Sequence, residues 1–131
     1  MVKSCETKTV LIIEDEADVR NFAARVLEME GYRVLQAGNG EEGIRLVREG
    51  RINLVLLDLR LPKRSGWTVL ALLKSEPELS VIPVIVFTAS AAIAQRERAL
   101  KIGAADYLIK PLSAASLKEA VARILHRKRW F

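Results

Sequence analysis

The chain has 131 residues, of which 50% are hydrophobic and 28% are charged, and its formal net charge is +5. This composition is typical of a single soluble globular domain that is long enough to bury a core. It excludes a membrane span, because no apolar run reaches the roughly 18 residues that a bilayer requires. The polar N-terminus is unlike a secretory signal and there is one cysteine, so we expect a cytoplasmic protein.

The two parts of the chain differ in charge. Residues 1–59 carry 8 Lys/Arg against 11 Asp/Glu, whereas residues 60–131 carry 13 against 5. A basic excess favours nucleic acid, an acidic partner or only a hydrated surface, and we adopt the last interpretation for most of these charges. Direct nucleic-acid binding is not expected, because no helix-turn-helix element is visible and the basic run at 127–129 also complements a helix dipole.

Strand-like and helix-like segments alternate five times along the chain. The strand-like segments are short apolar runs typical of strands buried on both faces, and in chain order they span residues 9–13, 32–37, 52–57, 81–87 and 106–109. The helix-like segments lie between them, at residues 19–27, 39–50, 67–74, 91–102 and 113–125. The apolar stripe of the first helix consists of Val19, Phe22, Ala23, Val26 and Leu27.

The residues at the segment ends support this division. Asn39 with Glu42 three residues later resembles a capping box, and Ser113 can cap the last helix. Glycine is common just beyond a helix end, and three expected helix ends are followed by Gly31, Gly50 and Gly103.

Strict alternation of strands and helices predicts an α/β fold. Parallel strands need crossover connections, which the helices supply. We therefore expect a single doubly wound five-stranded parallel sheet in the flavodoxin-like order 2-1-3-4-5, with five helices. The domain should cover residues 9–127, between a disordered N-terminal tail at 1–8 and a basic C-terminal tail at 128–131. Such sheets bind ligands beyond the carboxyl ends of their strands.

Chemically active side chains stand where four of the predicted strands end. Glu14 and Asp15 follow the first strand, Asp58 the third, Thr88 the fourth and Lys110 the fifth. In the order 2-1-3-4-5 the first and third strands are neighbours, so the three carboxylates converge. Two carboxylates about 4 Å apart repel by roughly 4 kcal/mol at an effective dielectric near 20. The cluster therefore needs a cation, and oxygen ligands of this kind suit Mg²⁺.

The same groups suit phosphoryl transfer. A carboxylate can attack phosphorus and form an acyl phosphate, and catalysis of this transfer is mostly positioning and charge neutralisation. Lys110 offers an ammonium for a phosphate oxygen, and Thr88 offers a hydroxyl donor at the same edge of the sheet.

Five short motifs in order resemble the landmarks of response-regulator receiver domains, over about residues 8–127. They are Glu14-Asp15, Asp58-Leu-Arg-Leu-Pro62 followed by Gly66, Thr88-Ala89, Tyr107, and Lys110-Pro111. The resemblance implies that Asp58 accepts the phosphoryl group. It also implies that Mg²⁺ or Mn²⁺ is bound directly by Asp15, mostly through water by Glu14, and by Asp58 and the backbone carbonyl of Arg60.

The resemblance further implies a switch. Lys110 would pair with the phosphoryl group, Thr88 would move to hydrogen-bond it, and Tyr107 would change position when Thr88 moves. The Lys110–Pro111 peptide bond would be cis.

In function, the resemblance implies a signalling switch of two-component phosphorelays and not an enzyme that turns over substrate. The donor would be a phosphohistidine on a sensor histidine kinase or histidine phosphotransfer protein, which would dock at the first helix. The output would be a downstream protein partner, for which a second copy of the chain is one candidate. The alternatives are a receiver-like module that binds without phosphorylation and a phosphatase of the haloacid-dehalogenase type. The second is disfavoured because such enzymes carry a second Asp where this chain has Arg60.

Overall fold

The structure is a computed structural model that describes residues 7–62 and 65–126. The lone Cys5, the basic run at 127–129, the predicted tail at 128–131 and most of the predicted tail at 1–8 lie outside the described residues. The domain boundaries at 9 and 127 therefore stay predictions. In the described part of the chain, no helix is both long enough and apolar enough to cross a membrane.

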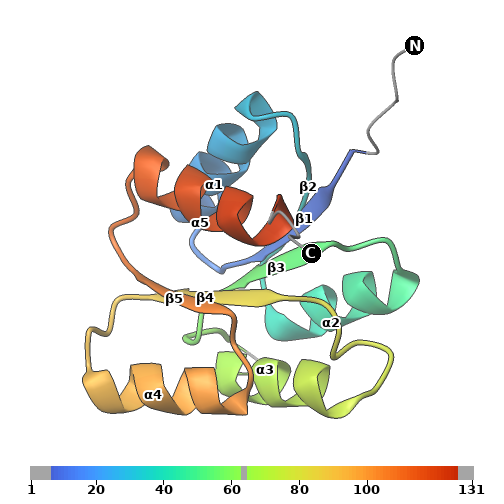
Figure 1. Cartoon of the computed structure of the whole chain (residues 1–131), viewed down its shortest axis with the longest axis vertical. Coiled ribbons are helices and arrows are strands. Elements are labelled where there is room, and N and C mark those ends of the chain that lie inside the picture. The colour runs from blue at the N-terminus through green and yellow to red at the C-terminus, as the bar shows by residue number, and fades with distance from the viewer. Residues whose placement is uncertain (1–6, 63–64, 127–131) are drawn as a thin grey trace, which may run out of the picture.

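Five strands alternate with five helices along the described chain (Figure 1). The strands are β1 (Thr9–Ile13), β2 (Arg33–Ala37), β3 (Leu54–Leu57), β4 (Val84–Thr88) and β5 (Asp106–Ile109). The helices are α1 (Ala17–Met29), α2 (Gly40–Glu49), α3 (Gly66–Ser75), α4 (Ile93–Ile102) and α5 (Ala114–Leu125).

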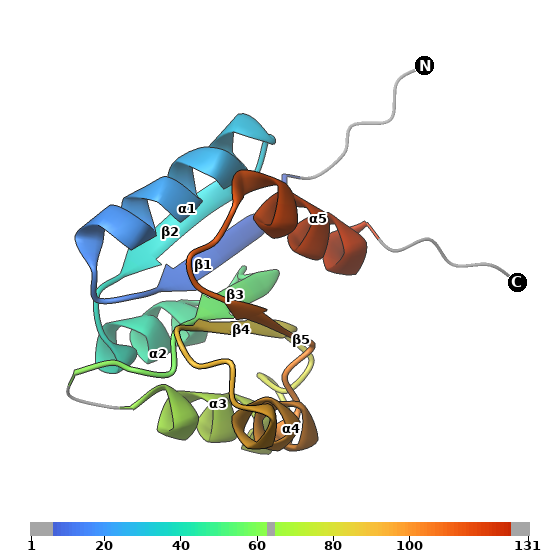
Figure 2. The ribbon, with the colours of Figure 1, turned by 90° about the vertical axis from the view of Figure 1, so that its left-hand side faces the viewer.

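The strands form one parallel sheet in the order β2-β1-β3-β4-β5, which confirms the predicted fold class. Helices α1 and α5 cover one face of the sheet, and α2, α3 and α4 cover the other (Figure 2). Alternate residues of the central strands supply the two cores, because successive side chains of a strand point to opposite faces. Leu11 and Val55 pack toward α2–α4, whereas Val10 and Leu54 pack toward α1 and α5.

The predicted helix ends are largely confirmed. Asn39 caps α2 and accepts a hydrogen bond from the Glu42 N–H at 2.9 Å. The Glu42 carboxylate accepts from the N–H of Gly38, not from that of Asn39, so the capping box is shifted by one residue. Ser113 caps α5. The three predicted helix-ending glycines have positive φ angles, which L side chains rarely adopt; they are Gly31, Gly50 and Gly103.

Several predicted element ends differ from the structure by one or more residues, and one predicted core residue is wrong. β4 begins at Val84, since Val81 is 79% exposed in the turn after α3 and Pro83 has no N–H for a ladder. β3 begins at Leu54 and not at Ile52; just before it, the side chain of Asn53 accepts a hydrogen bond from the Thr9 N–H. Phe22 is not part of the buried stripe of α1: it is 43% exposed, and the smaller Ala23 and Ala24 face the sheet.

Candidate functional site

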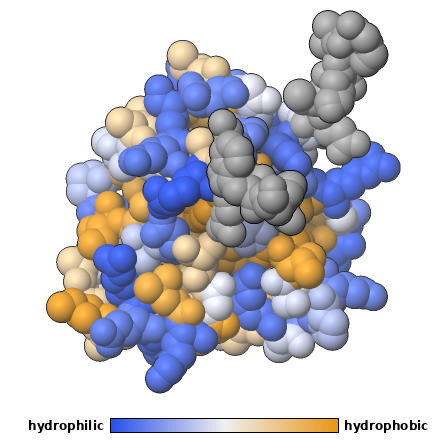
Figure 3. Space-filling model, in the orientation of Figure 1, coloured by the Kyte–Doolittle hydropathy of each residue, from blue (hydrophilic) through white to orange (hydrophobic). Residues whose placement is uncertain are grey.

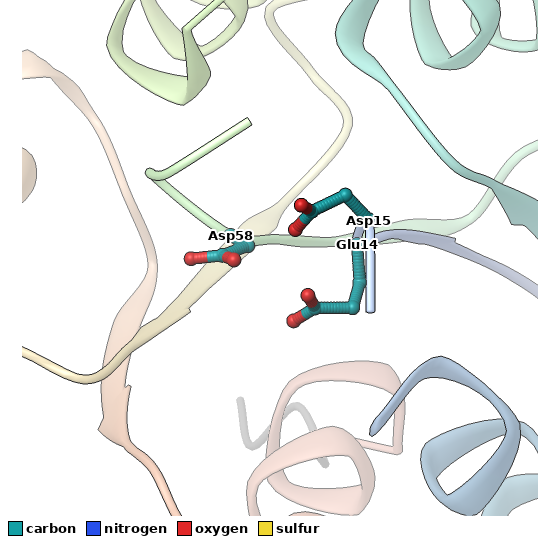
Figure 4. Close-up of side chains that lie close together, drawn as sticks. All are labelled: Glu14, Asp15 and Asp58. Atoms are coloured by element: carbon teal, nitrogen blue, oxygen red, sulfur yellow. The ribbon is translucent and has the colours of Figure 1, made fainter. Parts of the chain in front are cut away.

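Three carboxylates meet where β1 and β3 end (Figure 4). β1 and β3 pair with Ile13 opposite Leu57, so the next residues, Glu14 and Asp58, leave the sheet at the same level. The Glu14 and Asp15 side chains both extend from the end of β1 toward Asp58 (Figure 4). One oxygen of each carboxylate lies within 4.8 Å of the others. The predicted convergence of the three residues is confirmed.

The three carboxylates differ in burial. Glu14 is fully buried and Asp58 is 3% exposed, whereas Asp15 is exposed. The Asp58 backbone N–H donates to the Ile13 carbonyl at 3.0 Å, which holds the start of the β3–α3 loop against β1. Asp58 therefore presents its carboxylate from a fixed, nearly dry position, and Asp15 forms the side of the cluster that faces water.

Lys110 supplies the opposing charge. Its Nζ lies 3.1 Å from Asp58 Oδ2 and 2.5 Å from Glu14 Oε1. Burial lowers the pKa of Lys110, but the two carboxylates outweigh burial and leave this pKa raised above its usual 10.5. The ammonium is therefore charged at neutral pH. Pro111 follows it through a cis peptide bond, as the resemblance implied.

Glu14 is the most deeply buried of the three carboxylates. Burial raises the pKa of Glu14 above 4.5, the adjacent Lys110 ammonium and the hydrogen bond from the Glu16 N–H lower it, and the charge of Asp58 raises it again. The net direction is upward. The Glu16 N–H donates to Glu14 Oε2 at 2.9 Å. The Lys110 contact to Oε1 is an ion pair whose angle does not make a hydrogen bond, so Oε1 receives no hydrogen bond from the described residues.

The β3–α3 loop folds back on Asp58. The Arg60 backbone N–H donates to Asp58 Oδ1 at 3.2 Å, and Gly66 N–H donates to the Leu59 carbonyl at 3.0 Å. A Cβ on Gly66 would lie 2.2 Å from the Asp58 carbonyl oxygen, so only glycine fits there. An open cleft of about 330 Å³ beside Asp58 is lined by Asp15, Glu16, Asp58, Arg60, Ala89 and Lys110.

Thr88 and Tyr107 lie on β4 and β5, the strands that follow β3 in the sheet. Thr88 ends β4, is 1% exposed, and accepts a backbone hydrogen bond from the Lys110 N–H at 2.9 Å. The Tyr107 ring is buried, and its hydroxyl donates to the Ser90 carbonyl at 2.9 Å. Thr88 lines a neighbouring cavity of about 380 Å³ together with Trp67 and Gln95. The two predicted switch residues are thus joined through the β4–α4 loop.

The donor set fits a hard divalent cation. Asp15 and Asp58 line the water-facing cleft, and the buried Glu14 lies beside them. Glu14 Oε1 receives no hydrogen bond from the described residues, among which Lys110 is the cation that contacts the cluster. Magnesium and similar ions take such oxygen ligands together with waters. Glu14, Asp15 and Asp58 could hold the ion.

Sequence reasoning missed Arg20, whose guanidinium reaches the backbone carbonyl of Glu14. An arginine one turn into a helix carries no motif of its own, so only the folded chain reveals the contact. His126 follows α5, and its ring contacts the Tyr32 hydroxyl at 3.0 Å.

Known proteins resemble this chain in sequence and in structure. The family model described as "Response regulator receiver domain" matches residues 10–122. The phosphate regulon transcriptional regulatory protein PhoB of Pseudomonas aeruginosa is 38% identical over 121 residues, which cover 92% of this chain and 52% of PhoB. PhoB of Klebsiella pneumoniae is 38% identical over 117 residues, covering 89% and 50%. The chain spans about half the length of the curated relatives it matches.

The solved structures agree. A response regulator receiver domain protein from Clostridium thermocellum superposes with a TM-score of 0.83 at 31% identity, covering 92% of this chain and 95% of that one. A CheY-like receiver domain protein from Methanospirillum hungatei superposes with a TM-score of 0.83 at 29% identity, covering 92% and 95%.

Proposed function

The chain belongs to the response-regulator receiver domain family, and from this premise we propose that it is a phosphorylation switch with Asp58 as the phosphoacceptor. The observation that carries the proposal is the position of Asp58. It is a nearly buried carboxylate that is held between Lys110 and the Arg60 N–H and opens on a cleft. The other two carboxylates of the cluster come from β1 and stand beside it.

The proposed reaction transfers a phosphoryl group from a phosphohistidine on a sensor histidine kinase or histidine phosphotransfer protein. An oxygen of the Asp58 carboxylate bonds to phosphorus while the P–N bond of the donor breaks, and the leaving imidazole takes up a proton from solvent. Lys110 neutralises charge on the transferred group, because its ammonium already lies against Asp58 Oδ2. The chain thereby switches between two states and does not turn over a small substrate.

We assign the cation site to Asp15, Glu14, Asp58 and the backbone carbonyl of Arg60, with Mg²⁺ or Mn²⁺ as the ion. When bound, such an ion neutralises oxygens of the transferred group and orients them. Asp15 faces the cleft, while the Glu16 N–H and Lys110 hold the buried Glu14 in place. Glu14 therefore suits a contact through water better than a direct one.

The donor docks at α1 in this proposal. Phe22 exposes 43% of its surface on α1, and a groove of about 490 Å³ beside it reaches Lys110 and is also lined by Val19, Pro111 and Leu112. An apolar surface next to the acceptor provides contact area for a partner that must bring its phosphohistidine to Asp58. This explains why Phe22 faces outward although it fits the helical stripe.

The output in this proposal runs from Thr88 through Tyr107 to the surface of α4, β5 and α5. Over the part of this face where Figure 1 draws α4, hydrophobic and hydrophilic patches lie side by side (Figure 3). Ile93 is 71% exposed there, close in sequence to Arg96 and Lys101. We propose a protein partner with acidic groups for this surface, with a second copy of the chain as one candidate. Arg123 is already engaged by Asp106.

The test is intact mass after incubation with acetyl phosphate and Mg²⁺. The parent protein should gain the mass of one phosphoryl group, and Asp58→Asn should gain none because the amide is not a nucleophile of this kind. Asp18→Asn, an exposed change in the first turn of α1, is the matched control and should gain one. Uptake by Asp58→Asn equal to that of the parent would refute the acceptor assignment.

A further inference from the structure

Glu14, the residue that follows β1, has a backbone carbonyl that receives no hydrogen bond from the neighbouring strand β2. The Glu14 N–H continues the β1–β2 ladder by one bond, to the Ala37 carbonyl at 3.0 Å. The carbonyl of the same residue points to the same side, as in any strand. β2 ends at Ala37, however, and the N–H that would continue this parallel ladder, that of Asn39, makes no hydrogen bond to the Glu14 carbonyl in the described part of the chain. A donor from elsewhere must therefore satisfy the Glu14 carbonyl.

Arg20 is that donor. Its Nη1 donates to the Glu14 carbonyl oxygen at 2.8 Å, and its Nε donates to Gln36 Oε1 at 3.0 Å. Arg20 itself sits in the first turn of α1, where its N–H donates to the Glu16 carbonyl at 2.9 Å. One planar guanidinium thus joins the end of β1, the strand β2 and the start of α1. Two bonds from one rigid group fix its orientation, which a lysine ammonium does not do.

The contact fixes a peptide plane that matters for the cation. The Glu14 carbonyl and the Asp15 N–H belong to the same planar peptide group. Holding the carbonyl sets the orientation of this plane, and with it the direction in which the Asp15 side chain leaves the backbone. Asp15 is the exposed member of the carboxylate cluster, and its side chain receives no hydrogen bond from the described residues. The backbone is therefore what places its carboxylate.

We infer that Arg20 is a positioning residue for the cation site, acting through the Glu14–Asp15 peptide and itself oriented by Gln36. The inference rests on the proposed function, because it deepens the role assigned to Asp15. Arg20 is half-buried and Gln36 is exposed. Hydrogen bonds at such positions contribute little to stability, so the effect on the cation is separable from an effect on folding.

The experiment is a Mg²⁺ titration of the full chain, followed by the amide chemical shifts of ¹⁵N-labelled protein. We expect Arg20→Met to raise the Mg²⁺ dissociation constant about tenfold, as loss of a partner behind a metal ligand does. Arg20→Lys should restore part of the affinity, since its ammonium can still reach the Glu14 carbonyl. Gln36→Met should weaken binding less than Arg20→Met. The apo Asp15 amide resonance should also shift in Arg20→Met.

Arg48→Met is the matched control. Arg48 also makes two side-chain hydrogen bonds, to Glu76, but at the C-terminal ends of α2 and α3. Its removal should leave the Mg²⁺ dissociation constant unchanged. The spectra also show whether each variant is folded; should Arg20→Met not fold, Gln36→Met decides, and parent-like affinity in that variant overturns the inference.

Two negative results have different meanings. Parent-like Mg²⁺ affinity in folded Arg20→Met overturns the positioning role and leaves the proposed function standing. A parent protein that binds no Mg²⁺ overturns the proposed function and this inference with it.

Discussion

Two groups of ion pairs in this molecule contrast sharply. At the carboxyl ends of the strands, Lys110 lies among Glu14 and Asp58, with only 16% of its side chain exposed. At the ends of α2 and α3, Arg48 and Glu76 form a two-point pair at 3.0 and 2.8 Å with 51% and 37% of their side chains exposed. The second pair has the better geometry. The first has too many carboxylates for its one ammonium and places them where water is scarce.

The two groups of charges differ in what their burial costs. An exposed pair contributes little to stability, because water solvates the separated charges almost as well. A buried cluster costs desolvation that its own pairing does not fully offset. The excess negative charge of the cluster would attract a cation, and the cation together with Lys110 would then neutralise an incoming phosphoryl group. The comparison predicts four effects of decreasing size.

The largest effect should come from removing the ammonium. Lys110→Met leaves Glu14 and Asp58 buried without their cation, and we expect the free energy of unfolding to fall by about 3 kcal/mol. The loss stays near that value because Glu14, whose pKa burial already raises, can take up a proton. Urea unfolding in EDTA measures it. Lys101→Met, at an exposed site on α4, is the control; equal stability of the two variants would contradict the account.

The next effect concerns the cation. Asp15→Ala should raise the Mg²⁺ dissociation constant about a hundredfold, the upper end of what disturbed metal ligation costs. In the parent, saturating Mg²⁺ should also raise the unfolding midpoint, because the ion binds the folded state. Calorimetric titration and thermal unfolding check the two statements. If Asp15→Ala needs no more Mg²⁺ than the parent for phosphorylation, Asp15 is not a ligand.

A third effect is the dependence of stability on pH in metal-free protein. Burial, followed by the charge of Asp58, holds the pKa of Glu14 above 4.5 in the folded state. The folded protein then binds more protons than the unfolded chain above that pH, so stability falls as pH rises from 4.5 through the folded pKa. Glu14→Gln should remove this part of the decline, because the amide does not titrate.

The measurement for Glu14 is urea unfolding in EDTA at a series of pH values. Glu16→Gln is the control, because its carboxylate is 66% exposed. A decline that is the same in Glu14→Gln and in the parent would show that another group causes it.

The smallest effect should come from the exposed pair. Arg48→Met should lower the free energy of unfolding by less than about 1 kcal/mol, and it should leave uptake of the phosphoryl group from acetyl phosphate unchanged. Chemical unfolding measures the free energy of unfolding, and intact mass measures the uptake of the phosphoryl group. A loss as large as that in Lys110→Met would remove the contrast between the two groups of charges.

The strand order, the limits of β5 and the meeting of Glu14, Asp15 and Asp58 were predictable from the sequence. They follow from the alternation of apolar periods and from the rule that parallel strands end at one edge. The family motifs add the expected roles of Thr88 and Tyr107, which stay predictions.

Other features depend on contacts between distant residues. Helical spacing alone cannot distinguish Phe22, which faces water, from Ala23, which faces the sheet. The beginning of β4 depends on a turn that Lys74 holds by donating to the Ser80 and Ile82 carbonyls. The contact from Arg20 to the Glu14 carbonyl depends on the end of β2 at Ala37, which leaves this carbonyl without a hydrogen bond from the sheet. The spacing of residues along the sequence therefore does not predict these three features.

The central claim is that the phosphoryl group goes to Asp58 and not to another carboxylate of the cluster. Borohydride reduces an acyl phosphate to an alcohol, so a phosphorylated aspartate becomes homoserine at its own position. Peptide mapping by mass spectrometry after acetyl phosphate, Mg²⁺ and borohydride should find homoserine at position 58 alone. Reduction at Glu14 or Asp15 instead, or no reduced residue in protein that has gained a phosphoryl group, would contradict the account.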